Sequence, residues 1–95
     1  MSVYACCDAC VRYNYLELAN SSVKRGASFQ YCRDCLGSGA EPVEVLVELC
    51  ANNPEPSKDL QNAVAATIRR TAMTHAEFLA HVRKAEKESQ HAHQD

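Results

Sequence analysis

Two Cys-x-x-Cys motifs constrain what this chain can fold into more than any other feature. Cys7 and Cys10 form the first pair, Cys32 and Cys35 form the second, and 21 residues separate the two pairs. A Cys-x-x-Cys turn brings two sulfurs to one ion, and two such turns complete the tetrahedral shell of a structural zinc ion. The spacing is close to that of four-cysteine zinc sites. The sequence therefore predicts one structural Zn²⁺ ion bound by these four cysteines.

The two remaining cysteines have less specific interpretations. Cys6 could replace Cys7 as a ligand, but Cys7 gives the better-formed Cys-x-x-Cys turn. Cys50 lies on an apolar helical face, where a small buried hydrophobic residue is expected. The alternative to metal is a thiol redox protein that uses one of the pairs. Such a motif requires a strand–motif–helix context that we do not find in the sequence.

The length of 95 residues is typical of a single domain with a small core, which benefits from a metal staple. The sequence has no apolar run long enough to cross a bilayer, and its N-terminal segment lacks the pattern of a signal peptide. We therefore expect a soluble, cytoplasmic protein that does not contact membranes. In that reducing compartment, paired cysteines bind metal more often than they form disulfides.

A β-hairpin is predicted between the two cysteine pairs. Residues 13–18 and 23–31 are rich in aromatic and aliphatic side chains, and the turn-prone residues 19–22 separate them. Gly26 interrupts the second strand pattern, which indicates either a longer turn or a bulged strand.

The first third of the chain resembles treble-clef zinc fingers. The resemblance rests on Cys7-Asp8-Ala9-Cys10, the predicted hairpin, and Tyr31-Cys32-Arg33-Asp34-Cys35-Leu36. It implies that a knuckle and a hairpin precede a helix that supplies the last two ligands. The segment Gly37-Ser38-Gly39 departs from that pattern, because it leaves room for a single helical turn at most. A zinc ribbon, with two knuckles on hairpins, is the competing topology.

Helices are predicted in the rest of the chain. Residues 43–50 have helical spacing of apolar side chains, although their valines leave a strand open. Ser57 can cap a second helix, and Thr74 with Glu77 forms a capping box for a third. The predicted fold class is α+β: a small zinc-stabilised β-hairpin module followed by two or three α-helices. We expect one domain over residues 1–87, made of a zinc module (1–36) and a helical part (41–87), and a frayed tail over 88–95.

Catalysis is not expected. Four thiolates close the coordination shell, so the zinc ion has no open position for water. Treble-clef nucleases need a histidine to activate water, and His75 is the first histidine in the chain. The acidic residues show no paired acid–base arrangement, and no phosphate-binding glycine loop is present. The sequence therefore predicts a protein that is not an enzyme.

A protein that acts by contact needs a recognition surface, and the hairpin offers one. Alternation along the strand places Tyr13 and Tyr15 on one side, where exposed tyrosines could anchor a partner protein. The acidic segment 41–48 is a second candidate surface. The favoured function is a zinc-binding adaptor or regulator whose partner is a protein of a transcription or nucleic-acid-processing complex. The two apolar helices leave a homodimer open.

Direct nucleic-acid binding is the alternative function. Four basic residues lie around the cysteine module: Arg12, Lys24, Arg25 and Arg33. Zinc modules often present such side chains to phosphates. The formal net charge of −2 argues against it, because four zinc-bound thiolates would make the folded protein more negative still.

Overall fold

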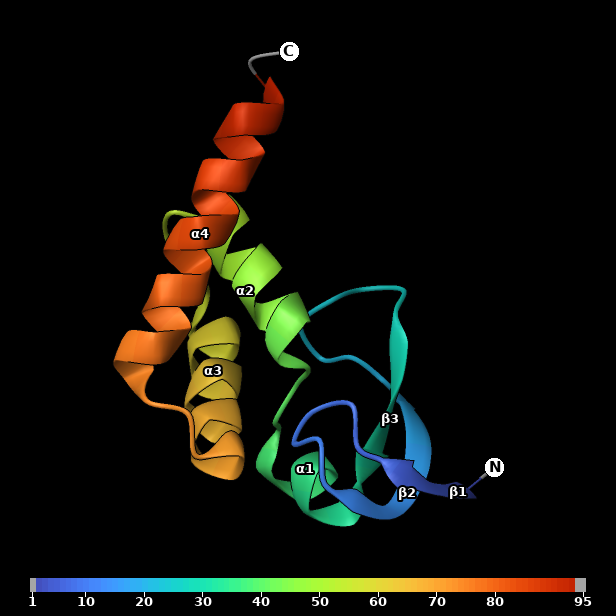
Figure 1. Ribbon diagram of the computed structural model, residues 1–95. Coiled ribbons are helices and arrows are strands. Elements are labelled where there is room, and N and C mark those ends of the chain that lie inside the picture. The colour runs from blue at the N-terminus through green and yellow to red at the C-terminus, as the bar shows by residue number, and fades with distance from the viewer. Residues whose placement is uncertain (1, 94–95) are drawn as a thin grey trace.

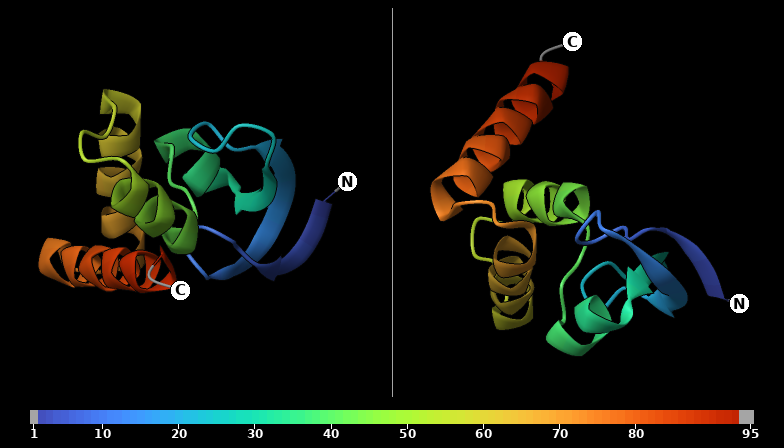
Figure 2. Two further views of the ribbon diagram at one scale, coloured as in Figure 1. Left: turned by 90° about the horizontal axis from the view of Figure 1, so that it is seen from above. Right: turned by 60° about the horizontal axis from the view of Figure 1, so that its bottom comes forward.

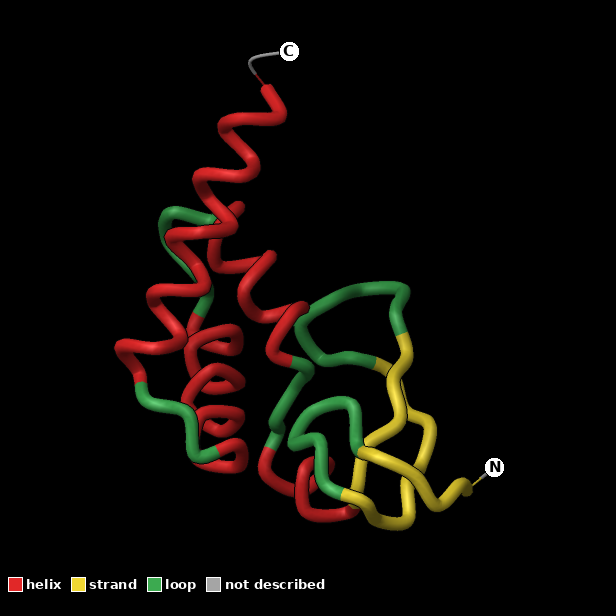
Figure 3. The backbone as a smooth tube through the Cα atoms, viewed as in Figure 1, coloured by secondary structure: helices red, strands yellow, loops and turns green. Residues whose placement is uncertain are grey.

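The three strands and a short first helix form one half of the molecule, and the three longer helices form the other half (Figure 1). The computed structural model describes residues 2–93. Three strands come first: β1 (Ser2–Cys6), β2 (Tyr13–Asn20) and β3 (Ser28–Cys32). Four helices follow: α1 (Arg33–Ser38), α2 (Val43–Asn52), α3 (Lys58–Thr71) and α4 (His75–His93). Figure 3 shows the two halves along the backbone, with α1 beside the strands, and the predicted α+β class is confirmed.

The sheet is antiparallel in the order β1-β2-β3, so the predicted hairpin is extended by a strand that the sequence analysis missed. Strand β1 precedes the first cysteine pair, which lies in the turn between β1 and β2. The hairpin turn covers residues 21–27 and contains Gly26, whose φ of +82° is a left-handed conformation that glycine adopts without steric cost. Of the two interpretations of Gly26, the longer turn is correct.

Helix α1 is longer than the sequence predicted. It continues through Gly37 and Ser38 and ends at Gly39, whose φ of +79° lets its amide donate to the carbonyl of Cys35 at 2.9 Å. A left-handed glycine is a common C-terminal cap. The glycines therefore end a short helix after Cys35 and do not prevent it.

The three longer helices begin where the sequence predicted. Residues 43–52 form a helix and not a strand. The Ser57 hydroxyl accepts a hydrogen bond from the Leu60 amide at 3.2 Å. The amide of Glu77 donates to the Thr74 hydroxyl at 3.1 Å, and the Thr74 amide donates back to the Glu77 carboxylate at 3.3 Å, which is the expected capping box.

Each half of the molecule is built around its own cluster of buried apolar side chains. The cluster of the sheet half includes Leu16 and Tyr31 with the four paired cysteines. The helical cluster consists of these buried residues: Leu46, Leu60, Ala63, Val64, Phe78 and Val82. The apolar spacing of α4 predicts a buried Leu79, which is wrong, since Leu79 is 39% exposed. Helix α2 packs against α4, where Phe78 and Val82 are buried, whereas Leu79 lines an open pocket beside them.

Helix α4 continues to His93, past the position where the sequence analysis ended the ordered part. Its second half extends beyond the other helices (Figure 1, and the right-hand view of Figure 2). Residues 94–95 of the expected frayed tail lie outside the described residues, and the fraying itself stays a prediction. No helix within residues 2–93 is long and apolar enough to cross a membrane.

A residue with a buried carboxylate joins the sheet half to the helical half. Glu41 lies in the connector between α1 and α2 and is 4% exposed. Its Oε1 accepts hydrogen bonds from the Tyr31 hydroxyl at 2.7 Å and from Ser21 Oγ at 2.8 Å. Its Oε2 accepts from Ser22 Oγ at 3.1 Å. The Glu41 amide donates to Thr67 Oγ1 of α3 at 2.9 Å, and the Thr67 hydroxyl donates to the Glu41 carbonyl at 3.0 Å.

The acidic segment 41–48 is therefore not one continuous partner surface. Glu41 faces inward and is fully engaged, whereas Glu44 and Glu48 are exposed on α2. Burial, together with the hydrogen bond and charge of Glu41, raises the pKa of the Tyr31 hydroxyl, which keeps it protonated as a donor. The sequence predicted an exposed Glu41, because Glu41 belongs to the same acidic segment as its neighbouring glutamates.

Replacing Glu41 by alanine should reduce the free energy of unfolding by about 2–4 kcal/mol, because three hydroxyl donors would lose their acceptor. Chemical denaturation followed by circular dichroism measures this change. The matched control is Glu55→Ala, since Glu55 is exposed in the loop before α3, and it should stay within about 0.5 kcal/mol of wild type. Equal effects of the two substitutions would contradict the structural role of Glu41.

Candidate metal centre

The four predicted ligands converge on one point inside the sheet half. The sulfurs of Cys7, Cys10, Cys32 and Cys35 all lie within 4.8 Å of one another, and all four residues are buried. The Sγ atoms of Cys10 and Cys32 are 3.8 Å apart, far beyond a disulfide bond of about 2.05 Å. Sulfurs about 2.3 Å from a tetrahedral zinc ion are separated by about 3.8 Å. The cluster could therefore hold one metal ion such as zinc.

The first cysteine pair occupies a tight turn between β1 and β2. The Cys7 amide donates to the Arg12 carbonyl at 2.9 Å, and the Val11 amide donates to the Cys7 carbonyl at 2.9 Å. Closing this turn places Val11 at a φ of +66°. That conformation is rare for a β-branched residue and costs about 1–3 kcal/mol.

Asp8 fixes the turn against the far edge of the sheet. Its amide donates to the Gln30 carbonyl at 3.0 Å, and its carboxylate accepts from the Gln30 amide at 2.8 Å. This pair of hydrogen bonds brings the first cysteine turn beside the end of β3. The Cys32 amide then donates to Cys7 Sγ at 3.3 Å, which joins the two cysteine pairs directly.

The second pair lies at a junction between a strand and a helix. Cys32 ends β3 and caps α1, and Cys35 lies one turn further along α1. Both side chains point into the buried cluster, where neither is measurably exposed. The second pair therefore lies between a strand and a helix and not in a second hairpin turn, so the strand–motif–helix context that the sequence analysis did not find is present in the structure.

Burial dominates the electrostatics of the thiols. It raises the pKa of Cys10 and of Cys35 and so favours their neutral form. Burial acts in the same direction on Cys32, but the amide and thiol of Cys35 outweigh it and lower the pKa of Cys32 to about 7. A metal ion binds thiolates, so metal binding here would release protons from the buried thiols.

An arginine from the helical half also reaches the cluster. Arg70 Nη2 of α3 lies 3.9 Å from Cys32 Sγ and 4.0 Å from Cys10 Sγ. The sulfurs, that of Cys35 first, raise the pKa of the Arg70 guanidinium above its ordinary value. Because arginines on an amphipathic helix usually face solvent, the sequence predicts that Arg69 and Arg70 are both exposed. The available signal was its helical spacing, because position 70 continues the buried row of Ala63 and Thr67.

The other cysteines lie outside the cluster. Cys6 is exposed at the end of β1, and Cys50 is partly buried on α2, where burial raises the pKa of its thiol. In the described part of the chain the sulfurs of the cluster come from Cys7 and not from Cys6.

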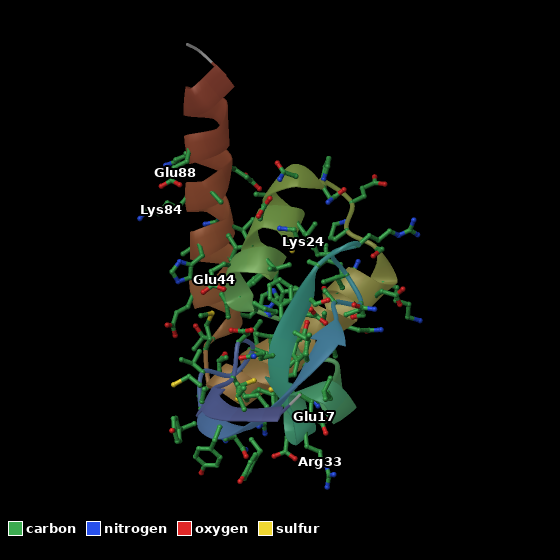
Figure 4. All side chains as sticks on the ribbon, turned by 90° about the vertical axis from the view of Figure 1, so that its right-hand side faces the viewer. Glu17, Lys24, Arg33, Glu44, Lys84 and Glu88 are labelled. Atoms are coloured by element: carbon green, nitrogen blue, oxygen red, sulfur yellow. The ribbon has the colours of Figure 1, made fainter. Side chains whose placement is uncertain are left out.

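The structure brings some of the predicted partner-binding residues together and separates others. Tyr13 and Tyr15 are exposed neighbours on β2. Lys24 lies in the turn beside α2, and its Nζ is 3.9 Å from the Glu48 carboxylate. Figure 4 shows Lys24 and Arg33 at opposite ends of the sheet half. The exposed Arg12, Arg25 and Arg33 therefore lie on different segments of the surface.

Comparison of the chain with protein-family models, with curated proteins and with solved structures finds no match.

Purified protein should contain one zinc ion per chain by elemental analysis. Serine in place of Cys10 or Cys32 should unfold the sheet half, because structural zinc contributes about 10–16 kcal/mol in small zinc fingers and a small domain has only about 5–15 kcal/mol of stability. The matched controls are Cys6→Ser and Cys50→Ala, which should shift the melting temperature only slightly. Absence of zinc, iron in its place, or equal shifts for all four variants in thermal melts would show that the ligand assignment is wrong.

Proposed function

We propose that the four cysteines bind one structural zinc ion and that the protein is a non-enzymatic adaptor or regulator, which binds another protein through exposed tyrosines of its sheet. The observation that carries this proposal is an aromatic cluster on the surface formed by Tyr4, Tyr13 and Tyr15. We call these three residues the tyrosine cluster.

The rings of the tyrosine cluster pack against one another and are solvent-accessible. The ring of Tyr4 lies edge-to-face with the ring of Tyr13 at 4.5 Å and with that of Tyr15 at 4.8 Å. The exposed fractions of the three residues are 51%, 64% and 67%. Tyrosines provide large contact areas with few rotatable bonds and are enriched among the residues that dominate binding energy. The pairing of β1 with β2 sets the positions of the rings before any partner binds.

Val11 supports the same location for the contact. Its side chain is 67% exposed although it is apolar, and its backbone is in the strained left-handed conformation described above. A glycine would occupy this position without strain. Strained and exposed apolar residues are found at functional sites more often than elsewhere, so Val11 extends the proposed contact surface from Tyr13 toward the first cysteine turn.

The position of the second cysteine pair supports a treble-clef arrangement over a zinc ribbon. The knuckle of Cys7 and Cys10 precedes the β2–β3 hairpin, and α1 carries the last ligand and is capped by the one before it. A ribbon would place both pairs in hairpin turns. With four cysteine ligands the zinc ion would have no open position, so its role would be structural.

The basic residues favour a protein over nucleic acid as the direct partner. Lys24 is engaged with Glu48, and Arg33 lies at the other end of the sheet half (Figure 4). Nucleic-acid binders generally place several such charges along one face. Direct nucleic-acid binding is the second candidate, because exposed tyrosines beside Arg12 could also stack on unpaired bases. A partner from a transcription or nucleic-acid-processing complex would use both kinds of residue.

The double variant Tyr13→Ala/Tyr15→Ala should weaken the protein complex, at about 1–3 kcal/mol for each tyrosine. The measurement is affinity capture from nuclease-treated cell lysate with the wild type and the variant as baits, followed by titration of the captured protein. The control is Lys24→Ala/Arg25→Ala, which should change mainly the rate of association. All baits must retain the wild-type zinc content.

A different outcome would make nucleic acid the primary partner. In that case the basic double variant would abolish binding, raising the salt concentration would reproduce its effect, and a labelled oligonucleotide would bind the wild type at micromolar concentration or tighter. That result would contradict the adaptor proposal.

A further inference from the structure

Arg70 is the one described basic residue that contacts the cysteine cluster, and it comes from the helical half of the chain. Its guanidinium reaches Cys10 and Cys32 at the distances given above and lies 3.7 Å from the carboxylate of Asp34. The Arg70 side chain is 23% exposed, whereas that of Asp34 is 71% exposed. The Nε atom of Arg70 is fully buried and has no hydrogen-bond partner.

The negative charge of a metal-bound cluster would account for the position of the Arg70 guanidinium beside the sulfurs. A divalent ion with four thiolates carries a net charge of −2, and charge buried away from water is unfavourable unless an opposite charge offsets it. Donors outside the ligand shell also orient metal ligands and tune their affinity. We propose that Arg70 compensates the charge of the metal–thiolate cluster and thereby makes the docking of α3 onto the sheet half depend on the bound metal. This inference rests on the metal site proposed above.

Without a metal ion, four thiolates at these distances would repel one another, so the cluster would not carry the full negative charge that Arg70 offsets. The partly buried guanidinium would then depend mainly on the exposed Asp34 carboxylate as its counter-charge. Its buried, unpartnered Nε makes that position more unfavourable. Metal binding and helix docking are then linked, and each must strengthen the other by the same factor.

The neighbouring contacts of α3 show that Arg70 is placed to transmit this effect. Ala66 belongs to the apolar cluster of the sheet half, and Thr67 holds Glu41. Residues 66, 67 and 70 lie on one side of the helix, as expected for three- and four-residue spacing. Thr67 hydrogen-bonds to the connector and not to the ligands, and Ala66 packs in the same cluster as the ligands but carries no charge. Arg70 is therefore the residue that makes the position of α3 depend on the charge of the cluster.

The test measures zinc affinity by competition with a chromogenic chelator. Arg70→Met, which keeps an unbranched apolar stem but removes the guanidinium and its charge, should weaken zinc binding by about 10–100-fold. Arg70→Gln is a second neutral variant in case the methionine variant does not fold. Arg70→Lys should recover most of the affinity. The matched control is Arg69→Met, because Arg69 is exposed on the same helix, and it should stay within about two-fold of wild type.

A second readout separates charge compensation from a packing role. The neutral variants should lose much of the zinc-dependent increase in melting temperature while the melting temperature of the metal-free protein changes little. A thiol-alkylating reagent should also release zinc from them faster, because the thiolates lose a neighbouring donor.

Three results would overturn the inference. The first is zinc affinity within two-fold of wild type in a folded neutral variant, and the second is a lysine variant as weak as the methionine variant. The third is an equal fall of the melting temperature with and without zinc. A wild-type chain that binds no zinc would instead refute the metal site itself, together with this inference.

Discussion

The convergence of four cysteine sulfurs at one buried point is the constraint on which the other features of the structure depend. The sheet half has three short strands and few large apolar residues in its core, where Leu16 and Tyr31 are the largest buried side chains. A core of this size provides little stability without a staple. The backbone is shaped around the sulfurs: Asp8 fixes the first cysteine turn to β3, and Val11 adopts a strained conformation to close that turn.

Polar contacts extend that constraint to the helices. Glu41 joins the hairpin turn to α3, and Arg70 joins α3 to the cysteine cluster. These contacts involve one buried carboxylate and one partly buried guanidinium, so both depend on their partners being in place. The helical cluster around Leu46 and Phe78 contains none of the four paired cysteines, and Val23 of the hairpin turn packs against it as a further link between the two halves.

Periodicity and motif spacing predicted much of this structure, because those signals are local. The two cysteine pairs, the caps at Ser57 and Thr74 and the fold class required no knowledge of the tertiary structure. Contacts between distant segments could not be predicted in the same way. Glu41 resembles its exposed neighbours until the fold buries it, and Arg70 resembles Arg69. Strand β1 was missed because five residues before a cysteine turn carry a weak pattern until β2 pairs with them.

The proposed dependence of the fold on a bound metal ion is tested most directly by a two-dimensional amide NMR spectrum recorded before and after treatment of the zinc-loaded protein with a strong chelator. The account predicts that the amide signals of residues 3–35 collapse to the narrow dispersion of an unfolded chain without metal. It also predicts that one equivalent of zinc restores them and shifts the α3 signals around Arg70. A metal-free chain that keeps the same dispersed spectrum would contradict the account.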